Sequence, residues 1–178
     1  MNVDFNKPKE NSDVNTHNES EIFIPEPSNF IIGKMIKVKI KKLHPDAKIP
    51  TYATEGSVGM DIYSIDCEYK ADIDCFVYHT GLAFEIPEGY GLFPIPQSRN
   101  RKTDFYMPNT PGLVDVDFRG EVVLSYKSRD KYLQKQPFEV GEKCGQLVLI
   151  PCPKIEFEEV EELSETKRGN GSHGSTGN

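Results

Sequence analysis

Apolar and polar residues alternate along short stretches of the chain, beginning directly after Met35. Ile36, Val38 and Ile40 are separated by lysines. Successive side chains of a β-strand point to opposite faces, so this period of two predicts a half-buried strand with one face in water. Further short runs of this kind follow at residues 75–79, 82–86, 90–95, 121–127, 146–150 and 155–163.

Turn signals rich in proline and glycine separate these runs, at residues 87–89, 110–112 and 140–142. Many short strands divided by regular turns are typical of an antiparallel sandwich or barrel. Helical periodicity is weak throughout, and one short helix is expected near residues 128–133. The pattern therefore predicts an all-β domain over residues 35–163.

Both ends of the chain differ from this domain in composition. Residues 1–34 begin with a polar stretch that cannot bury enough apolar surface to offset its ordering entropy, so we expect a disordered or loosely attached extension. Residues 164–178 end in RGNGSHGSTGN, which has four glycines and no aliphatic or aromatic side chain. We expect this tail to be flexible and to become ordered only against a ligand or partner.

Composition places the domain in the soluble class. The chain has 178 residues, of which 37% are hydrophobic, and this fits one domain. It shows neither a secretory signal nor an apolar stretch long enough to span a membrane, so we predict a cytoplasmic protein, or one of the host cytoplasm or nucleus if viral. The four cysteines lack CxxC spacing and are expected to be reduced.

The net charge of −7 argues against a non-specific grip on nucleic acid. An acidic chain that binds a polyanion needs local arginine and lysine side chains or a bound cation. The tail is one candidate, because glycine amides, hydroxyls and the charge of Arg168 could surround a phosphate chain. An unstructured chain end is the alternative.

Two further segments contain residues suited to binding or catalysis. Residues 55–61, EGSVGMD, form a tight loop that leads into a strand, and Asp61 could face a metal ion, although an ordinary turn is the commoner explanation. Residues 109–121, NTPGLVDVDFRGE, place a Pro-Gly turn before Asp115. This hairpin could present backbone groups to a base while Asp115 polarises a water molecule, or it could be a plain surface hairpin.

Together and in this order, these segments resemble the five sequence motifs of the trimeric dUTPase family. The resemblance implies a distorted jelly-roll β-barrel of the β-clip type, assembled as a homotrimer whose active sites are shared between subunits. It also implies hydrolysis of dUTP to dUMP and pyrophosphate by water attack on the α-phosphate, with Mg²⁺. The five motifs correspond to residues 55–62, 96–104, 112–121, 141–147 and 168–177.

The resemblance also implies roles for individual residues. Asp115 would orient the attacking water as general base, and Asp61 would contact waters on Mg²⁺. Phe118 stands where the family usually has tyrosine and would pack against the deoxyribose. Contacts to uracil are expected from Asn109, Gly112, Leu113 and Val114. Contacts to the phosphates are expected from Ser98 and Gln146. In the closing tail, His173 would stack on uracil, and the γ-phosphate would be held by Arg168, Ser175 and Thr176.

Some positions depart from the family pattern. Gln97 replaces an arginine, and Arg99 or Arg101 could supply the missing charge. His173 replaces an aromatic residue that stacks on uracil, so activity is expected to fall at mildly acid pH. Motif four has Lys143 and Cys144 where arginine and an aliphatic residue are commoner. The histidines outside the motifs, His17, His44 and His79, are expected to be structural or solvated.

Two other functions fit the same scaffold. A dCTP deaminase-like enzyme shares the fold and a related hairpin, but the tail from Arg168 resembles the dUTPases. A nucleotide-binding regulatory protein could do without the family's arginine and aromatic residue, which Gln97 and His173 replace. It would not need the carboxylate of Asp115. Nucleotide hydrolysis is therefore the function that the sequence favours.

Overall fold

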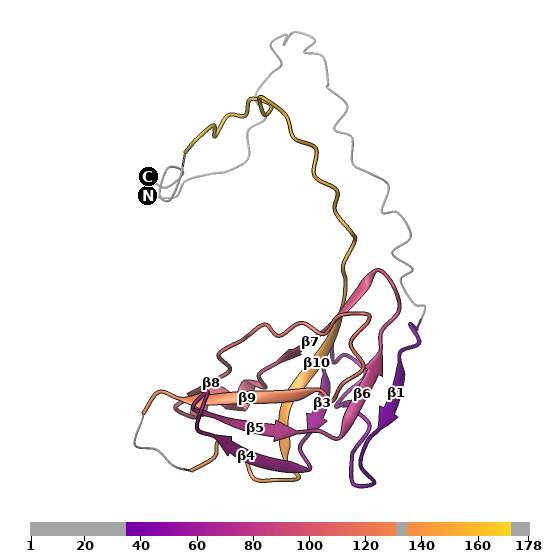
Figure 1. The fold of residues 1–178 in the computed structure, drawn as a ribbon, viewed down its shortest axis with the longest axis vertical. Helices are drawn as coiled ribbons and strands as arrows, with labels where there is room; N and C mark the ends of the chain where they lie inside the picture. Colours follow the sequence, from indigo (N-terminus) through magenta and orange to yellow (C-terminus); the bar gives the residue numbers. More distant parts are fainter. Residues whose placement is uncertain (1–34, 131–134, 172–178) are drawn as a thin grey trace, which may run out of the picture. The chain divides into compact units, whose positions relative to one another are not determined.

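A computed structural model of the chain describes residues 35–130 and 135–171 (Figure 1). The chain divides into two units after Ile36, and the elements below belong to the second unit. Within the described residues, no helix is of the length and apolarity that crossing a membrane requires. The elements are β1 (Lys39–Lys42), β2 (Thr51–Tyr52), β3 (Met60–Tyr63), β4 (Asp66–Lys70), β5 (Cys75–His79), β6 (Leu82–Glu85), β7 (Tyr90–Ile95), the 3₁₀-helix η1 (Ser98–Lys102), β8 (Phe105–Tyr106), β9 (Val123–Ser128) and β10 (Lys143–Pro151).

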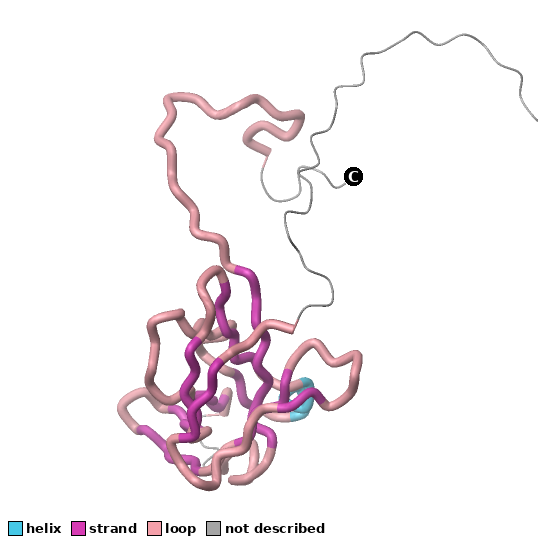
Figure 2. The backbone as a smooth tube through the Cα atoms, turned by 90° about the vertical axis from the view of Figure 1, so that its right-hand side faces the viewer, coloured by secondary structure: helices cyan, strands magenta, loops and turns pink. Residues whose placement is uncertain are grey.

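The strands form three sheets, and all of their pairings are antiparallel. The strand orders are β1-β6, β2-β3-β10-β7 and β4-β5-β9-β8. Strands far apart in the chain are therefore neighbours, because β10 lies between β3 and β7 while β9 pairs with β5. This arrangement confirms the expected all-β, jelly-roll type of fold, and Figure 2 shows the single cyan turn of η1 among strands and loops.

Most of the expected strands are present. β5 and β7 have the bounds that the alternating pattern indicates, and β6, β9 and β10 overlap the expected runs. The first strand, β1, begins at Lys39 and pairs with β6. Burial alternates along β9, whose side chains point in turn to the core and to its surface, whereas β5 and β6 are buried along most of their length.

One expectation about local structure is wrong, and a second is contradicted only in the part that the structure describes. Residues 155–163 form no strand but an exposed loop (Figure 2), because alternation alone does not supply the neighbouring strand that β-structure needs. In the expected helix near residues 128–133, Ser128 is the last residue of β9 and 129–130 form a bend, while 131–133 lie outside the described residues. The sequence pattern had not indicated η1, which ends with Arg101 and Lys102.

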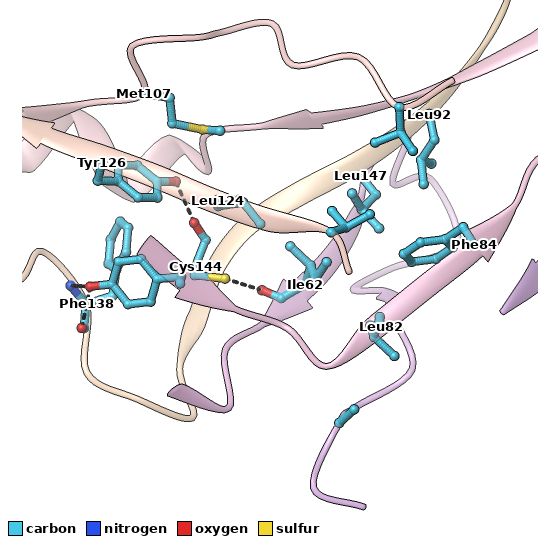
Figure 3. Close-up of a cluster of buried hydrophobic side chains, with 14 of the residues drawn as sticks. Ile62, Leu82, Phe84, Leu92, Met107, Leu124, Tyr126, Phe138, Cys144 and Leu147 are labelled. Atoms are coloured by element: carbon cyan, nitrogen blue, oxygen red, sulfur yellow. Dashed lines mark hydrogen bonds between the residues drawn. The ribbon is translucent and has the colours of Figure 1, made fainter. Parts of the chain in front are cut away.

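The core contains side chains from all three sheets (Figure 3). Two of its largest members are tyrosines whose hydroxyls are satisfied. Tyr78 donates to the Phe138 carbonyl at 2.7 Å and accepts from the Phe138 amide at 2.9 Å, and Tyr126 donates to the Cys144 carbonyl at 2.5 Å. Burial raises the pKa of both phenols, so they stay neutral and act as hydrogen-bonding core residues.

The cysteines are free thiols, as expected, and those of Cys75 and Cys144 are buried. Burial raises the pKa of Cys144 to about 12 and that of Cys67 to about 11. Because the thiolate is the reactive form, these two side chains behave as small core residues rather than nucleophiles.

Candidate active site

A polar cluster crosses the sheet where β3, β10 and β7 lie side by side. Asp61 of β3 is 5% exposed, and it faces Gln146 of β10, which in turn pairs with Ile95 of β7. Asp61 Oδ1 accepts a hydrogen bond from Gln146 Nε2 at 3.2 Å, and Asp61 Oδ2 lies 2.5 Å from Lys143 Nζ. The structure thus brings together Asp61 and Gln146, which belong to different motifs.

The segment after β7 contacts the same cluster. The side-chain amide of Gln97 donates to the Lys143 carbonyl, and Ser98 follows it as an exposed residue at the start of η1. A cavity of about 480 Å³ opens here. It is lined by Tyr63, Gln97, Arg99, Glu142 and Lys143.

Charged pairs border this cavity. The Arg99 guanidinium lies 3.0 Å from Glu142 Oε2 and 5.2 Å from the centre of the Phe138 ring. Its hydrogen bond lowers the pKa of Glu142, and the hydrogen bond to Asp61 raises the pKa of Lys143. Glu142 and Lys143 are therefore charged at neutral pH, and the side chains of Arg99 and Lys143 place two cations at the edge of the cavity.

The second part of the site is the hairpin around Asp115. Val114 exchanges two backbone hydrogen bonds with Leu92 of β7, at 2.9 and 3.3 Å. Gly112 is buried against Pro94, whose Cγ would lie 3.0 Å from an added Cβ. These contacts hold the hairpin against β7, while Leu113 and Asp115 remain exposed.

A tight turn follows Asp115. Its carbonyl accepts from the Phe118 amide at 3.2 Å. Arg119 Nη1 donates to the carbonyls of Val116 and Phe118 at 2.6 and 2.9 Å. The Phe118 ring lies over Gly120, where an added Cβ would be 2.7 Å from its Cζ. This turn fixes the direction of the backbone after Asp115 and leaves the Phe118 ring 44% exposed.

The structure distinguishes between the four residues expected at uracil. The backbone N–H and C=O of Val114 are bonded to Leu92, and its side chain is buried, so Val114 holds the hairpin in place. Asn109 and Leu113 are exposed, whereas Gly112 is buried at the turn. Of these residues, Asn109 and Leu113 are therefore accessible at the surface.

The tail residue Arg168 contacts its own segment. Its Nε donates to the Gly171 carbonyl at 2.9 Å, and the Gly171 amide donates back to the Arg168 carbonyl at 3.0 Å. The side chain is exposed. The other expected tail residues, His173, Ser175 and Thr176, lie outside the described residues.

The hairpin and the polar cluster are on opposite edges of one strand. Leu92 of β7 pairs with Leu149 of β10 on one edge and with Val114 on the other. Gln146 lies on the β10 side, opposite Ile95. Within one chain, β7 therefore lies between Val114 of the hairpin and Gln146 of the polar cluster.

The described residues include no group of three or more histidine, cysteine, aspartate or glutamate side chains placed to hold a metal ion. Asp61 is a single carboxylate that already has two partners. In nucleotide sites Mg²⁺ keeps several waters and is bound by one or two carboxylates together with the substrate phosphates. The donors present therefore fit a Mg²⁺ that arrives on a triphosphate.

Sequence reasoning missed a contact that supports the hairpin. Glu121, the residue that ends motif three, accepts from the Gly81 amide at 2.7 Å and from His79 Nδ1 at 2.9 Å. His79 Nε2 lies 3.1 Å from Glu68 on the other side. The three side chains come from distant parts of the chain, so no local pattern in the sequence indicates their contact.

Comparison with known proteins matches residues 45–177 to the dUTPase family model. Among curated relatives, the deoxyuridine 5'-triphosphate nucleotidohydrolase of Nautilia profundicola is 41% identical over 145 residues, and that of Hydrogenobaculum sp. is 38% identical over 145 residues. Each match covers 80% of this chain and 99% of the relative.

Solved structures show the same fold. A mutant of the Staphylococcus bacteriophage 80alpha dUTPase with dUpNHpp has a TM-score of 0.66 at 25% identity, covering 80% of this chain and 99% of that one. A mutant dUTPase from phage phi11 of S. aureus, described with a structural Mg(II) ion, has a TM-score of 0.59 at 20% identity, covering 71% and 98%. The second similarity supports the fold alone.

Proposed function

This chain belongs to the dUTPase family, and from that membership we propose that it is a dUTP diphosphatase, which hydrolyses dUTP to dUMP and pyrophosphate. The observation that carries the proposal is the match over residues 45–177. Relatives that share 38 and 41% of their residues with this chain bear the name of that enzyme. The matched region contains the polar cluster, the hairpin and the tail.

Asp115 is the proposed general base. Its carboxylate is exposed on a hairpin that two hydrogen bonds and the packing of Gly112 hold against β7. It would accept a proton from water as the water oxygen attacks the α-phosphorus. The P–O bond to the β-phosphate breaks in the same step, and pyrophosphate leaves.

The residues around Asp115 suit the nucleoside. Asn109 and the backbone of Gly112 and Leu113 would bind the edge of uracil. The ring of Phe118, which is 44% exposed, would pack against the deoxyribose. A flat aromatic face there leaves no room for a 2′-hydroxyl, so the site would discriminate against UTP.

Gln146, Ser98 and the tail residue Arg168 are the proposed phosphate contacts. Asp61 would contact Mg²⁺ through water, and the ion would neutralise charge on the phosphates and polarise them. A cation suits a chain with a net charge of −7, which otherwise repels a polyanion.

We further propose a homotrimer with shared active sites. Placement of the hairpin and the polar cluster on opposite edges of β7 supports this, because contacts from a second chain would complete each half. Residues 153–163 support it as well, since Ile155, Phe157 and Leu163 are 73, 89 and 87% exposed. Large apolar side chains gathered in one exposed segment suggest a partner surface.

The decisive assay is pyrophosphate release from dUTP, dTTP, dCTP and UTP in parallel with Mg²⁺, together with ammonia release from dCTP. The proposal expects pyrophosphate from dUTP alone. Ammonia from dCTP would instead indicate a deaminase, and binding of dUTP without turnover would indicate a regulatory protein.

Replacing the proposed base tests the mechanism. Asp115→Asn keeps the size of the side chain but removes its basicity, so turnover should fall by about 10² to 10⁴-fold. Binding of dUpNHpp, measured by calorimetry, should persist. Turnover close to that of the unmodified protein would exclude Asp115 as the base.

A further inference from the structure

A positive charge that the family places at the phosphates is missing at position 97, where this chain has glutamine and the family has arginine. The structure gives the Gln97 amide a different contact, a hydrogen bond to the backbone carbonyl of Lys143. Gln97 therefore binds to the backbone from which the Lys143 side chain extends.

The Lys143 ammonium lies between a buried acid and an open cavity. On one side it is 2.5 Å from Asp61 Oδ2, whose side chain is 7% exposed. On the other side the Lys143 side chain is 42% exposed and lines the cavity of about 480 Å³. An ammonium group has three donors, so it can retain Asp61 while donating to a ligand in the cavity.

Asp61 also connects Lys143 to the expected phosphate contact Gln146. The same carboxylate accepts from Gln146 Nε2 at 3.2 Å, and Gln146 lies opposite Asp61 in the sheet. A phosphate that reached the Gln146 amide would therefore be close to the Lys143 ammonium. The nearby exposed Ser98 follows Gln97, which contacts the Lys143 backbone.

The other candidate cation at this cavity has different contacts. The Arg99 guanidinium is bonded to Glu142 at 3.0 Å and covers the Phe138 ring at 5.2 Å. Moving it to a phosphate would remove both contacts, whereas Lys143 can keep its own. Arg99 is therefore the less suitable phosphate ligand of the two.

We propose that the Lys143 ammonium supplies the positive charge that binds the phosphate chain, in place of an arginine at position 97, and that Asp61 and Gln97 are positioning residues for it. This inference rests on the proposed function, because it requires a nucleotide triphosphate in the cavity. It identifies a specific binding residue and explains how the chain tolerates glutamine at position 97.

Calorimetric binding of dUpNHpp and of deoxyuridine tests the inference directly. A charge-assisted hydrogen bond contributes enough that Lys143→Met should weaken dUpNHpp binding by about tenfold to a hundredfold, both in EDTA and with Mg²⁺. Deoxyuridine has no phosphate, so its affinity should stay the same. A merely structural role for Lys143 would weaken both ligands together.

Charge rescue provides the second arm. Gln97→Arg in the Lys143→Met background should recover most of the lost affinity, because it returns a cation to the same side of the cavity. Lys41→Met, at an exposed lysine of β1, is the matched control and should bind both ligands normally. Arg99→Met should weaken dUpNHpp binding less than Lys143→Met does.

Lys143→Met leaves the buried Asp61 carboxylate without its cation and can destabilise the fold. The double variant Asp61→Asn/Lys143→Met removes both charges, and its thermal unfolding should stay close to that of the unmodified protein. It should still bind dUpNHpp weakly and deoxyuridine normally.

Normal dUpNHpp binding by Lys143→Met or by the double variant would overturn the inference, and so would a larger loss in Arg99→Met. These outcomes leave the proposed function intact as long as the unmodified chain releases pyrophosphate from dUTP. Failure of the unmodified chain to bind dUpNHpp or to hydrolyse dUTP would overturn both.

Discussion

Single side chains connect distant parts of this fold through a few buried or half-buried polar contacts. His79 lies between Glu121 at 2.9 Å and Glu68 at 3.1 Å, and Lys70 pairs with Glu68 at 3.0 Å. The hydrogen bond to Glu121, followed by that to Glu68, raises the pKa of His79. The histidine therefore gains a proton more readily in the folded state than in the unfolded chain.

This contact predicts a pH dependence of stability. Because the folded pKa of His79 lies above its unfolded value of about 6.5, its stabilising contribution is complete below that pH and is lost as pH rises through the folded pKa. Urea unfolding of the unmodified protein should give a free energy of unfolding to which this group contributes a decline as pH rises above about 6.5. His79→Gln should reduce that decline.

His44→Gln is the matched control, because His44 is half exposed and lies 3.6 Å from Asp46 at the surface. It should leave the pH dependence nearly unchanged. Equal slopes in the unmodified protein and in His79→Gln would show that the paired carboxylates do not hold a charged imidazole.

The Tyr78 hydroxyl offers a second test at this scale. It satisfies both backbone groups of Phe138 in the core, so Tyr78→Phe would leave a buried N–H and C=O without this partner. We expect a loss of about 1–3 kcal/mol in the free energy of unfolding, measured by urea denaturation. Tyr52→Phe, on a 56% exposed side chain, should change it little, and an equally small effect of Tyr78→Phe would contradict the assignment.

At the scale of elements, β10 connects the core to the site. It pairs with β3 and β7 and places Lys143 and Gln146 beside Asp61. Its register with β3 shifts between Lys143 and Gly145. An added Cβ at Gly145 would collide with Leu124 and lie 2.9 Å from the Ile95 carbonyl, so the close approach of the strands there requires glycine.

Gly145→Ala should therefore destabilise the fold by about 1–3 kcal/mol through overpacking. The added methyl group should also shift the backbone of β10 between Lys143 and Gln146 and thereby weaken dUpNHpp binding. Gly56→Ala is the control, since nothing lies within 4 Å of its added Cβ. Thermal unfolding compares the two variants, and an unchanged midpoint in Gly145→Ala would show that β10 tolerates the methyl group.

At the scale of the whole molecule, one chain leaves apolar side chains uncovered. Residues 155–163 alternate like a strand but are exposed loop, and Phe157 is 89% exposed. Burial of such a side chain contributes about 1.5–3 kcal/mol, which a second copy of the chain would supply. In the proposed trimer, a neighbouring chain would cover the apolar side chains of residues 155–163, which explains why they are apolar although the segment forms no strand in one chain.

Light scattering on a sizing column tests this assembly. The chain mass is 20.1 kDa, so a trimer should elute with about three times that mass. The double variant Phe157→Glu/Leu163→Glu should dissociate at higher protein concentration than the unmodified protein. Glu156→Gln/Glu158→Gln, in the same segment, should not, and a monomeric unmodified protein would contradict the proposed assembly.

Local pattern was enough to predict much of the fold. The short apolar runs at residues 75–79 and 90–95 match the bounds of β5 and β7, because a strand packed in the core needs apolar side chains over its whole length. Motif order indicated the family through short segments such as the hairpin around Asp115. Alternation in residues 155–163 misled, because it describes the side chains but not the neighbour that a strand needs.

The amino-acid sequence by itself determined the all-β class and the candidate residues, since both depend on residues close together in the chain. The tertiary structure alone decided which of those residues meet. Asp61 reaches Gln146 across 85 positions, and Gln97 reaches the Lys143 backbone across 46. Such contacts follow from strand pairing and register, which bring together positions whose separation no local pattern encodes.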